Sequence, residues 1–484
     1  MKLIHGLLLA SLVTVSNMTE TSAAALPPSS TIKVQGRNLI VNNSTFTVKG
    51  VCYSPVKAGY TNANFDWWSD QNACKSDFPL IAAMGANCIR TYSPSAADSY
   101  VQAVLDAAAR HGLYVILGYS VPWNQDFSVA ANRTPVVNGF TDFVNKWKAH
   151  PAVLMWCFGN EIDVHTASAA GWFTLLDQAS AAAHAAEGAG YHPVTTANQE
   201  MDEVAVYDSS VPNLDVWGLN LYRGKTFGAI FSVYSSTKPF MITEWGCDSF
   251  DGRVGNANET LQSEYIAGQW EDINGHLSHK NPAECCIGGC LFEWCDEWWK
   301  GASSPGDLST LGGGGVKGPA VQDTAADWTN DNYADPNMNE EWWGIVAIEL
   351  DSYTRKPKEA YYALGRLWEG STDASGDAGG SAAGIIQGEV RNYPNPFIAD
   401  GNNSTRIKFA VSGAPELNIE IFDLSGAKVR ELSGINSAGS LREAYWDGKD
   451  SDSGVVPSGL YICKVSAALS GREEIKYRKI AAVK

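Results

Sequence analysis

The sequence predicts an α/β protein in which a (β/α)8 TIM barrel is followed by a small all-β sandwich. Three observations lead to this fold class. Short apolar runs alternate with longer helical stretches from Thr31 to about Trp368. A segment rich in Gly, Ala, Ser and Asp, residues 370–384, then breaks the periodicity. Beyond it, apolar and polar residues alternate with period two, which indicates half-buried strands.

The predicted barrel is built from alternating strands and helices. The candidate strands are residues 48–53, 87–92, 114–119, 153–158, 193–197, 216–220, 240–243 and 287–294. The candidate helices are residues 74–84, 99–111, 137–150, 168–187, 227–235, 259–275 and 358–368. Strands that alternate with helices form parallel sheets with right-handed crossovers. Eight such units in this length fit a barrel better than an open sheet.

Two more segments belong to the predicted barrel. Residues 33–41 have the pattern of a hairpin, which we expect to close the barrel floor. Residues 302–335 are rich in Gly, Ser, Pro and Asp and follow the eighth strand. We therefore expect a long active-site loop there rather than a linker.

The part after the glycine-rich segment has the pattern of a separate all-β unit. Residues 406–411, 417–422 and 459–465 are its candidate strands, and short strands at close spacing predict a small sandwich. The predicted bounds are therefore 31–369 for the barrel, 370–386 for a flexible linker and 387–484 for the sandwich.

The beginning of the chain has the pattern of a secretory signal peptide. Residues 7–15 are apolar but too few to span a bilayer, and Ala23-Ala24-Ala25 offers small residues for cleavage. We expect residues 1–25 to be removed and the protein to be secreted or held at the cell surface. No later segment has the length and apolar character of a membrane helix.

Charge and composition narrow the kinds of partner. The formal net charge of −18 argues against nucleic acid and against anionic membrane surfaces. The 17 Trp, 19 Tyr and 16 Phe include rings suited to the apolar faces of sugars.

The cysteines between Cys285 and Cys295 lack the paired spacing and neighbouring histidines of a zinc site. We expect structural disulfides or buried thiols there, and no metal or other cofactor.

Two glutamates directly follow two of the predicted strands. Glu161 follows residues 153–158 and the turn Gly159-Asn160, and Glu244 follows residues 240–243. In a parallel barrel, the strand ends and the loops after them carry the chemistry. Cleavage of a glycosidic bond needs one carboxyl to protonate the leaving oxygen and another to attack or support the anomeric carbon. Either glutamate alone could be a surface turn, but the pair predicts a catalytic site.

Three polar residues at strand ends are candidates for supporting that site. Arg90 ends the second predicted strand and would keep a neighbouring carboxylate ionised; a surface ion pair is the alternative. Asn160 could donate to a sugar 2-hydroxyl or could simply form the turn. Tyr222, after the sixth strand, could hydrogen-bond the nucleophile or could be an ordinary aromatic residue at the rim of the core.

The end of the eighth strand is dense in aromatic and acidic residues, with Phe292-Glu293-Trp294 followed by residues 295–299 (CDEWW). This composition predicts a sugar platform in which Trp294 stacks and Glu293 binds at the polar edge. A corner of the core filled by tryptophan is the alternative. Further platform candidates are Tyr119, Trp123 and the pair Trp67-Trp68, whereas His111 and His165 are expected to be structural.

The residues at the strand ends resemble those of the retaining glycoside hydrolases of clan A. Asn160-Glu161 after the fourth strand and Glu244 after the seventh match that clan's pattern. The clan's arginine after strand two and tyrosine after strand six fall on Arg90 and Tyr222. The resemblance implies Glu161 as the acid/base and Glu244 as the nucleophile.

A closer likeness lies in the N-terminal half of the barrel. Residues 36–38 (GRN), 48–53 (VKGVCY), 74–79 (CKSDFP) and 85–92 (GANCIRTY) resemble the β-1,3-glucanosyltransferases of fungal walls. Residues 243–247 (TEWGC) fit them too, with Trp245 where they usually carry tyrosine. Residues 292–300 are more similar to bacterial barrels of the family 2 and family 5 type. The clan resemblance covers the whole barrel, and the family resemblance covers part of it.

The last part of the chain is similar to bacterial secretion-sorting and hook-assembly domains of the immunoglobulin-like type. The likeness rests on residues 393–397 (YPNPF), 421–426 (IFDLSG), 446–448 (WDG) and 458–461 (SGLY). It implies an immunoglobulin-like sandwich with a sorting or spacer role, whose partner would be the secretion machinery, and no chemistry of its own.

Together, these inferences predict an exported, retaining β-glycosidase that hydrolyses a β-linked polysaccharide, with a β-glucan as the expected substrate. The alternatives among enzymes are a β-1,3-glucanosyltransferase and a β-mannan or β-galactoside hydrolase. The alternative from another class is a non-catalytic carbohydrate-binding protein on a decayed barrel. The intact Glu161, Glu244, Arg90 and Asn160 argue against decay.

Overall fold

The computed structural model describes residues 24–62, 65–253, 255–300, 333, 339–349, 352–368, 385–393, 395, 397–401, 403–423, 426–438, 441–469 and 472–484. Three predicted segments therefore lie wholly or mainly outside the described residues. They are the signal peptide at 1–25, the loop at 302–335 and the linker at 370–386.

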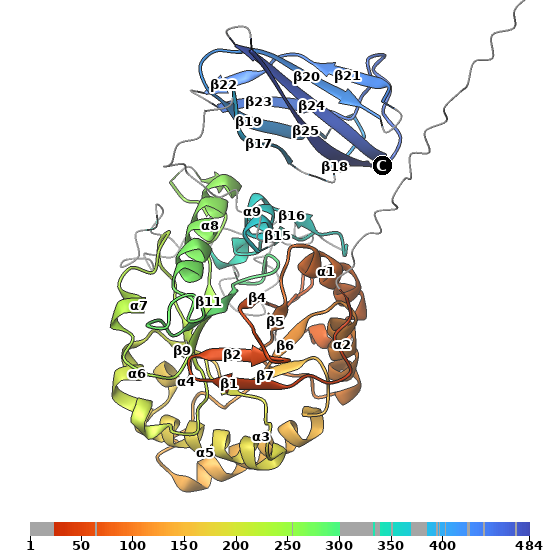
Figure 1. Ribbon diagram of the computed structural model, residues 1–484. Helices are drawn as coiled ribbons and strands as arrows, with labels where there is room; N and C mark the ends of the chain where they lie inside the picture. The colour runs from red at the N-terminus through yellow and green to blue at the C-terminus, as the bar shows by residue number, and fades with distance from the viewer. Residues whose placement is uncertain are drawn as a thin grey trace, which may run out of the picture.

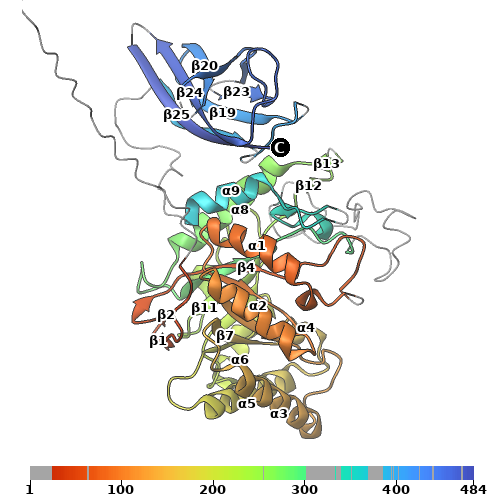
Figure 2. The same ribbon diagram turned by 90° about the vertical axis from the view of Figure 1, so that its right-hand side faces the viewer.

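The first unit is built on a nine-stranded parallel sheet (Figures 1 and 2). In spatial order its strands are β8 (Val194–Thr195), β7 (Val153–Phe158), β6 (Tyr114–Tyr119), β5 (Cys88–Arg90), β4 (Val48–Cys52), β14 (Cys286–Leu291), β11 (Phe240–Trp245), β10 (Trp217–Asn220) and β9 (Asn198–Gln199). β8 and β9 are halves of one interrupted strand, and a parallel bridge joins Thr195 to Val216 beside β10. The sheet therefore curls until its two ends meet, as in a TIM-barrel-like fold.

Each of the eight predicted apolar runs contains a strand of this sheet. The strands β7, β11 and β14 are buried along their whole length, as expected for parallel strands covered on both faces. The fifth run contributes the fewest strand residues, because only two of its residues form β8.

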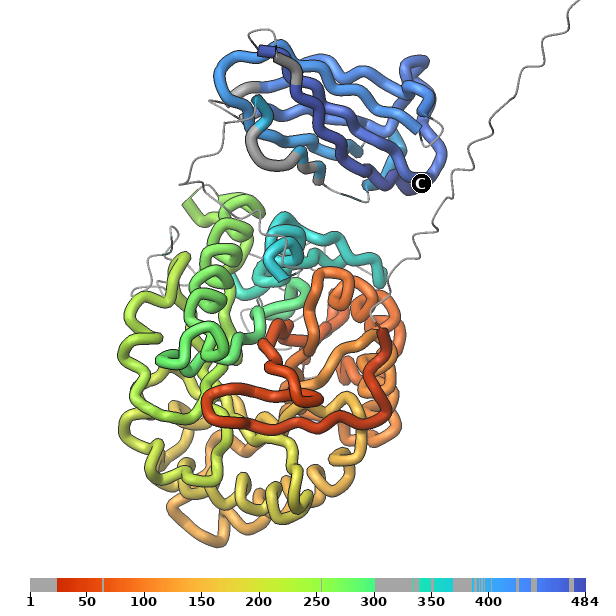
Figure 3. The backbone as a smooth tube through the Cα atoms, viewed as in Figure 1, coloured from red at the N-terminus to blue at the C-terminus, as the bar shows by residue number. Residues whose placement is uncertain are grey.

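Helices surround the curled sheet, and Figure 3 shows the chain passing round it before it continues into the last hundred residues. The α-helices are α1 (Gln71–Ala83), α2 (Asp98–Arg110), α3 (Ala130–Trp147), α4 (Ile162–His165), α5 (Ala169–Glu187), α6 (Asp202–Tyr207), α7 (Ile230–Val233), α8 (Glu259–Gly275) and α9 (Glu359–Trp368). The 3-10 turns are η1 (Trp67–Ser69), η2 (Asp208–Ser210) and η3 (Glu340–Trp342). The helix α3 begins well before the predicted residue 137 and contains Pro135.

A small antiparallel sheet covers the end of the barrel at which the strands begin. It consists of β1 (Ile32–Gln35), β2 (Asn38–Val41) and β3 (Ser44–Thr45). Leu39 and Val41 pack in the same hydrophobic cluster as Val48 and Ile116 of the barrel strands. Two further hairpins, β12 (Phe250–Asp251) with β13 (Asn256–Ala257) and β15 (Val346–Ala347) with β16 (Lys356–Pro357), follow β11 and β14 along the chain.

The second unit is all-β and has two sheets. One contains β17 (Ile386–Tyr393), β19 (Thr405–Val411), β23 (Leu441–Trp446) and β22 (Asn436–Ala438). The other contains β18 (Phe397–Ile398), β25 (Arg472–Val483), β24 (Gly459–Leu469), β20 (Glu416–Phe422) and β21 (Lys428–Leu432). Phe409 of the first sheet and Val465 of the second belong to one hydrophobic core, which is separate from those of the barrel. The immunoglobulin-like kinship of this unit stays a prediction.

The ten cysteines all lie in the described part of the chain, and all are buried free thiols. Of the two expectations for them, buried thiols rather than disulfides are what the structure has. Within the described residues, no helix combines the length and apolar character needed to cross a membrane.

Candidate active site

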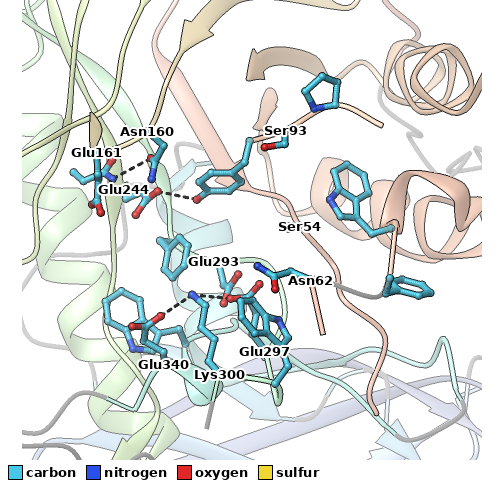
Figure 4. A pocket seen from close by; sticks show the side chains of 18 of the residues that line it. Ser54, Asn62, Ser93, Asn160, Glu161, Glu244, Glu293, Glu297, Lys300 and Glu340 are labelled. Atoms are coloured by element: carbon cyan, nitrogen blue, oxygen red, sulfur yellow. Dashed lines mark hydrogen bonds and ion pairs between the residues drawn. The ribbon is translucent and has the colours of Figure 1, made fainter. Parts of the chain in front are cut away.

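A pocket of about 1150 Å³ lies at the end of the barrel where the strands finish. Asn160, Glu161 and Glu244 line it (Figure 4). Tyr222 is also one of its lining residues. Glu244 belongs to β11, and Glu161 comes three residues after the end of β7. The two glutamates singled out from the sequence are therefore brought into one cavity, as two-carboxylate chemistry requires.

Three donors hold the carboxylate of Glu244, which is only 7% exposed. Arg90 donates from Nη1 to Oε1 at 2.7 Å, and the hydroxyl of Tyr92 donates to the same oxygen at 2.9 Å. The hydroxyl of Tyr222 donates to Oε2 at 2.7 Å. Hydrogen bonds to a charged acceptor are short and strong, so these three donors hold the carboxylate of Glu244 in a fixed position.

The side chain of Arg90 is fully enclosed, being 1% exposed. Its guanidinium carbon lies 4.5 Å from the centre of the Tyr92 ring, so the cation also rests on an aromatic face. Nη2 donates to Oδ1 of Asn160 at 2.6 Å. Burying a guanidinium is costly unless it is paired and hydrogen-bonded, and Glu244 supplies the opposite charge.

Glu161 sits in a different environment from Glu244. Its backbone has a left-handed conformation, with φ of 53°, and its N–H donates to the carbonyl of Ala197 at 2.7 Å. The carboxyl accepts one hydrogen bond, from Nδ2 of Asn220 to Oε1 at 2.8 Å. Burial raises the pKa of the Glu161 carboxyl, and the nearby charge of Glu244 adds to the rise. A carboxyl whose pKa is raised can hold a proton to donate.

Asn160 and Asn220 form a hydrogen-bonded chain between Arg90, which binds Glu244, and Glu161. Asn220, at the end of β10, donates to Glu161 and also lies 3.3 Å from Oδ1 of Asn160. Because Oδ1 of Asn160 accepts from Arg90, the amide NH2 of Asn160 is the group that can donate to a ligand.

A buried acidic cluster occupies another part of the same pocket. Glu293 and Glu297 both line it, and burial raises the pKa of each carboxyl, with further contributions from the acidic neighbours. Lys300 forms ion pairs of 2.7 Å with Glu297 and with Glu340 (Figure 4). Oε1 of Glu293 is buried and has no hydrogen-bond partner among the described residues. Glu293 therefore lines the pocket, and its binding to the polar edge of a sugar stays a prediction.

The structure does not bring Trp294 to the pocket. The residue is 1% exposed, belongs to the main hydrophobic core and packs against Tyr361 of α9, with ring centres 6.2 Å apart. β14 ends at Leu291, so strand alternation does not set the directions of the side chains that follow it. Phe292 and Glu293 both line the pocket, whereas Trp294 packs into the core. The aromatic wall of the pocket comes instead from Phe65, Trp67, Trp68, Phe292, Trp299 and Trp343.

Two residues that sequence reasoning missed complete the site. Tyr92 follows Arg90 by two residues, and Asn220 precedes Tyr222 by two. Residues two apart in a strand share a face, so each could have been found from the predicted residue beside it. Trp343 and Glu340 also line the pocket, but they come from a segment far beyond β14 that carries no strand-end signal.

Among the residues that the structure describes, no three His, Cys, Asp or Glu side chains gather in a way that could hold a metal ion.

The sequence profile of the glucanosyltransferase family, glycoside hydrolase family 72, matches residues 21–271, which is more than half of the chain. The 1,3-beta-glucanosyltransferase gas5 of Schizosaccharomyces pombe is 27% identical over 256 residues, which are 47% of this chain and 48% of that protein. The beta-glucuronidase of Sus scrofa is 28% identical over 284 residues, 55% of this chain and 40% of that protein. The chain spans about half the length of the curated relatives it matches.

Among solved structures, Saccharomyces cerevisiae Gas2p in complex with laminaripentaose aligns with 71% of this chain and 70% of its own. The sequence identity is 16% and the TM-score is 0.44.

Proposed function

The chain belongs to the glucanosyltransferase family of glycoside hydrolases, and we propose that it is a retaining enzyme that transfers a glycosyl unit from a β-glucan to a sugar acceptor. Hydrolysis is the competing outcome, when water takes the place of the acceptor. The sequence analysis put hydrolysis first and transfer second. Family membership, together with relatives named as 1,3-beta-glucanosyltransferases, supports the reverse order and a β-1,3-linked substrate.

The observation that carries the proposal is the contrast between the two carboxyls of one pocket. Glu244 accepts three hydrogen bonds, one of them from a buried guanidinium. Glu161 accepts one, and its pKa is raised by burial. Two carboxyls in such different surroundings suit two roles, with Glu244 as the ionised nucleophile and Glu161 as the proton donor.

In the first step, the carboxylate of Glu244 attacks the anomeric carbon of the bound glucan. Glu161 gives its proton to the glycosidic oxygen, so the bond to the leaving chain breaks and a glycosyl-enzyme ester forms. In the second step, a hydroxyl of the acceptor loses its proton to Glu161 and its oxygen attacks the anomeric carbon. The ester bond to Glu244 breaks, and the β configuration is restored. The amide NH2 of Asn160 can donate to the sugar 2-hydroxyl during both steps.

A retaining mechanism requires the two carboxyl groups to lie about 5–5.5 Å apart, whereas inversion needs roughly 6.5–9.5 Å. A crystal structure of the protein would give this separation directly. Secretion, the immunoglobulin-like type of the last hundred residues and their sorting role remain predictions from the sequence.

The function can be tested by mixing the purified protein with β-1,3-gluco-oligosaccharides of one defined length. Transfer gives products longer than the donor, which mass spectrometry resolves, and NMR of the newly formed end reports its configuration. Products of β configuration longer than the donor are expected. Cello-oligosaccharides, manno-oligosaccharides and an aryl β-glucuronide serve as comparison substrates, and Glu244→Gln serves as the inactive control. First-formed products of α configuration, or turnover confined to the comparison substrates, would overturn the proposal.

A further inference from the structure

A second cavity of about 380 Å³ adjoins the catalytic pocket. It is formed by the segments that follow β5, β6 and β7, and it includes Ser120, Trp123 and His165. The two cavities share four lining residues, namely Tyr92, Ser93, Asn160 and Glu161. They are therefore neighbouring parts of one cleft that meet at the acid/base.

The two glutamates differ in which cavities they line. Glu244 lines the large pocket but not the second cavity, whereas Glu161 lines both cavities. In double displacement, the nucleophile bonds to the sugar that is retained, and the acid/base serves the oxygen that leaves or arrives. The retained sugar thus belongs with Glu244 in the large pocket. The departing or incoming chain belongs on the far side of Glu161.

From this geometry we propose that the second cavity is the acceptor site and that Trp123 is the ring on which the acceptor sugar stacks. The inference rests on the proposed transferase function and adds to it the place of the acceptor. It also assigns Trp123 as a residue that decides between transfer and hydrolysis.

Trp123 has the placement that a sugar platform requires. It is 61% exposed, although tryptophan is usually largely buried. The ring of His165, in α4, meets it edge to face, with the centres 5.9 Å apart and the planes at 71°. The contact fixes the direction of the indole, and so much exposure leaves ring surface for a ligand. Two tyrosines also line this cavity, but Tyr92 donates its hydroxyl to Glu244, and Tyr119 is packed against Phe140, Phe143 and Phe158.

The size and polarity of the second cavity also suit a short stretch of saccharide. Its volume is at the lower end of the range for small-molecule sites, about 300–1,000 Å³. Ser93 and Ser120 supply hydroxyl groups, and the aromatic ring supplies an apolar face, which together match a sugar ring.

The chemical step at this site is the second half of the transfer. A hydroxyl of the acceptor, held over Trp123, gives its proton to the Glu161 carboxylate, and its oxygen bonds to the anomeric carbon. The bond between that carbon and Glu244 breaks, and the carboxylate of Glu244 is released. Water can attack the same anomeric carbon without stacking on an aromatic ring. Loss of Trp123 should therefore weaken transfer and leave hydrolysis intact.

The test uses β-laminaribiosyl fluoride as the donor, because fluoride leaves without occupying the acceptor site. Laminaribiose is added as the acceptor, and full-length wild type, Trp123→Ala and Trp123→Tyr are compared. Tyr100→Ala, which removes an exposed ring from α2 that lines neither cavity, is the matched control. Fluoride release without acceptor measures hydrolysis, and chromatography of the products measures transfer.

In Trp123→Ala, the ratio of transfer to hydrolysis at subsaturating acceptor should fall about tenfold, which corresponds to about 1.4 kcal/mol of lost acceptor binding. Fluoride release without acceptor should stay within about twofold of wild type, and Trp123→Tyr should keep most of the transfer.

An unchanged ratio of transfer to hydrolysis in Trp123→Ala overturns the acceptor site while the transferase function stands. An equal loss of hydrolysis and transfer places Trp123 on the donor side and also overturns it. A wild-type protein that releases no fluoride from this donor overturns the proposed function, and the acceptor site with it.

Discussion

Arg90 and Glu244 are 154 residues apart in the sequence and form an ion pair of 2.7 Å between Nη1 and Oε1. Their strands, β5 and β11, are not neighbours, because β4 and β14 lie between them in the sheet. The pair therefore crosses the interior of the barrel. Since the same guanidinium also donates to Asn160, one buried cation holds both Glu244 and the residue before Glu161.

Removing either tyrosine hydroxyl from Glu244 should slow the reaction. Tyr222→Phe and Tyr92→Phe each delete one hydrogen bond to a charged group, worth about 1.5–3 kcal/mol. We expect kcat to fall roughly 10- to 100-fold in each variant. Tyr234→Phe is the matched control, because it loses a hydrogen bond to the carbonyl of Lys238 away from the site. Steady-state kinetics that showed the same loss in all three variants would contradict a specific role for Tyr222 and Tyr92.

The raised pKa of Glu161 should depend in part on Glu244. Burial is the larger cause of the rise and the charge of Glu244 the second. Glu244→Gln removes that charge, so the pKa of Glu161 should fall while staying above its ordinary value. Titration of the Glu161 carboxyl by carbon NMR in both proteins measures the change. A pKa that rises in Glu244→Gln would show that the two carboxyls do not repel each other as the structure indicates.

Asp163 should make the protein less stable as the pH rises. Burial raises the pKa of its carboxyl from 3.8 to about 7, and Oδ2 has no hydrogen-bond partner in the part of the chain that the structure describes. The folded state therefore holds this proton more tightly than the unfolded state, so the free energy of unfolding falls between about pH 4 and pH 7. Asp163→Asn should gain roughly 2–4 kcal/mol over wild type at pH 8, relative to their difference at pH 4.

Thermal or urea unfolding at the two pH values measures this gain. Glu271→Gln, at an exposed position of α8, is the comparison variant. A stability difference between Asp163→Asn and wild type that is the same at pH 4 and pH 8 would contradict the assignment.

The strand-end residues could be predicted from the sequence because their placement follows from local periodicity. An apolar run fixes where a buried strand ends, and parallel strands deliver their ends to one face of the barrel. That reasoning places Glu161, Glu244 and Tyr222 in the pocket, where the structure has them. It also identifies Arg90, whose guanidinium donates to Glu244.

The aromatic walls could not be predicted in the same way. Trp294 lies beyond the end of β14 at Leu291, where strand alternation no longer decides whether a side chain faces the pocket or the core. Trp343 lines the pocket from a segment that follows residues 302–335, and no strand-end pattern in the sequence marks its position. The exposure of Trp123 similarly depends on the edge contact with His165, which no sequence period specifies.

Removal of residues 385–484 should leave catalysis nearly unchanged. All the side chains that line the two cavities belong to the barrel. The contacts between the all-β unit and the barrel include an ion pair of Arg406 with Glu359 and a hydrogen bond from Tyr362 to the carbonyl of Asn395, at 3.0 Å. These groups all lie outside the two cavities. We expect kcat/KM on soluble oligosaccharides within about twofold of the full chain, since catalysis depends on groups that touch the substrate. A truncated protein with native circular dichroism but no turnover would contradict this expectation.

The roles of the two glutamates can be separated by the stereochemistry of chemical rescue. Glu244→Ala removes the attacking group, so turnover should be lost. Azide can enter the space left by the side chain and attack from that side. A β-linked donor should then give a glycosyl azide of inverted, α configuration. Partial recovery with azide, and none with chloride, is the expected pattern.

Glu161→Ala should behave in the opposite way. It keeps the nucleophile, so a donor whose leaving group needs no proton should still form the glycosyl-enzyme on Glu244. Azide then attacks from the side that Glu161 has vacated, and the product should be a glycosyl azide of retained, β configuration. NMR of the azide products distinguishes the two cases. If the configurations were exchanged between the two variants, the roles of Glu161 and Glu244 would be reversed, and full activity in either variant would mean that the pair does not carry catalysis.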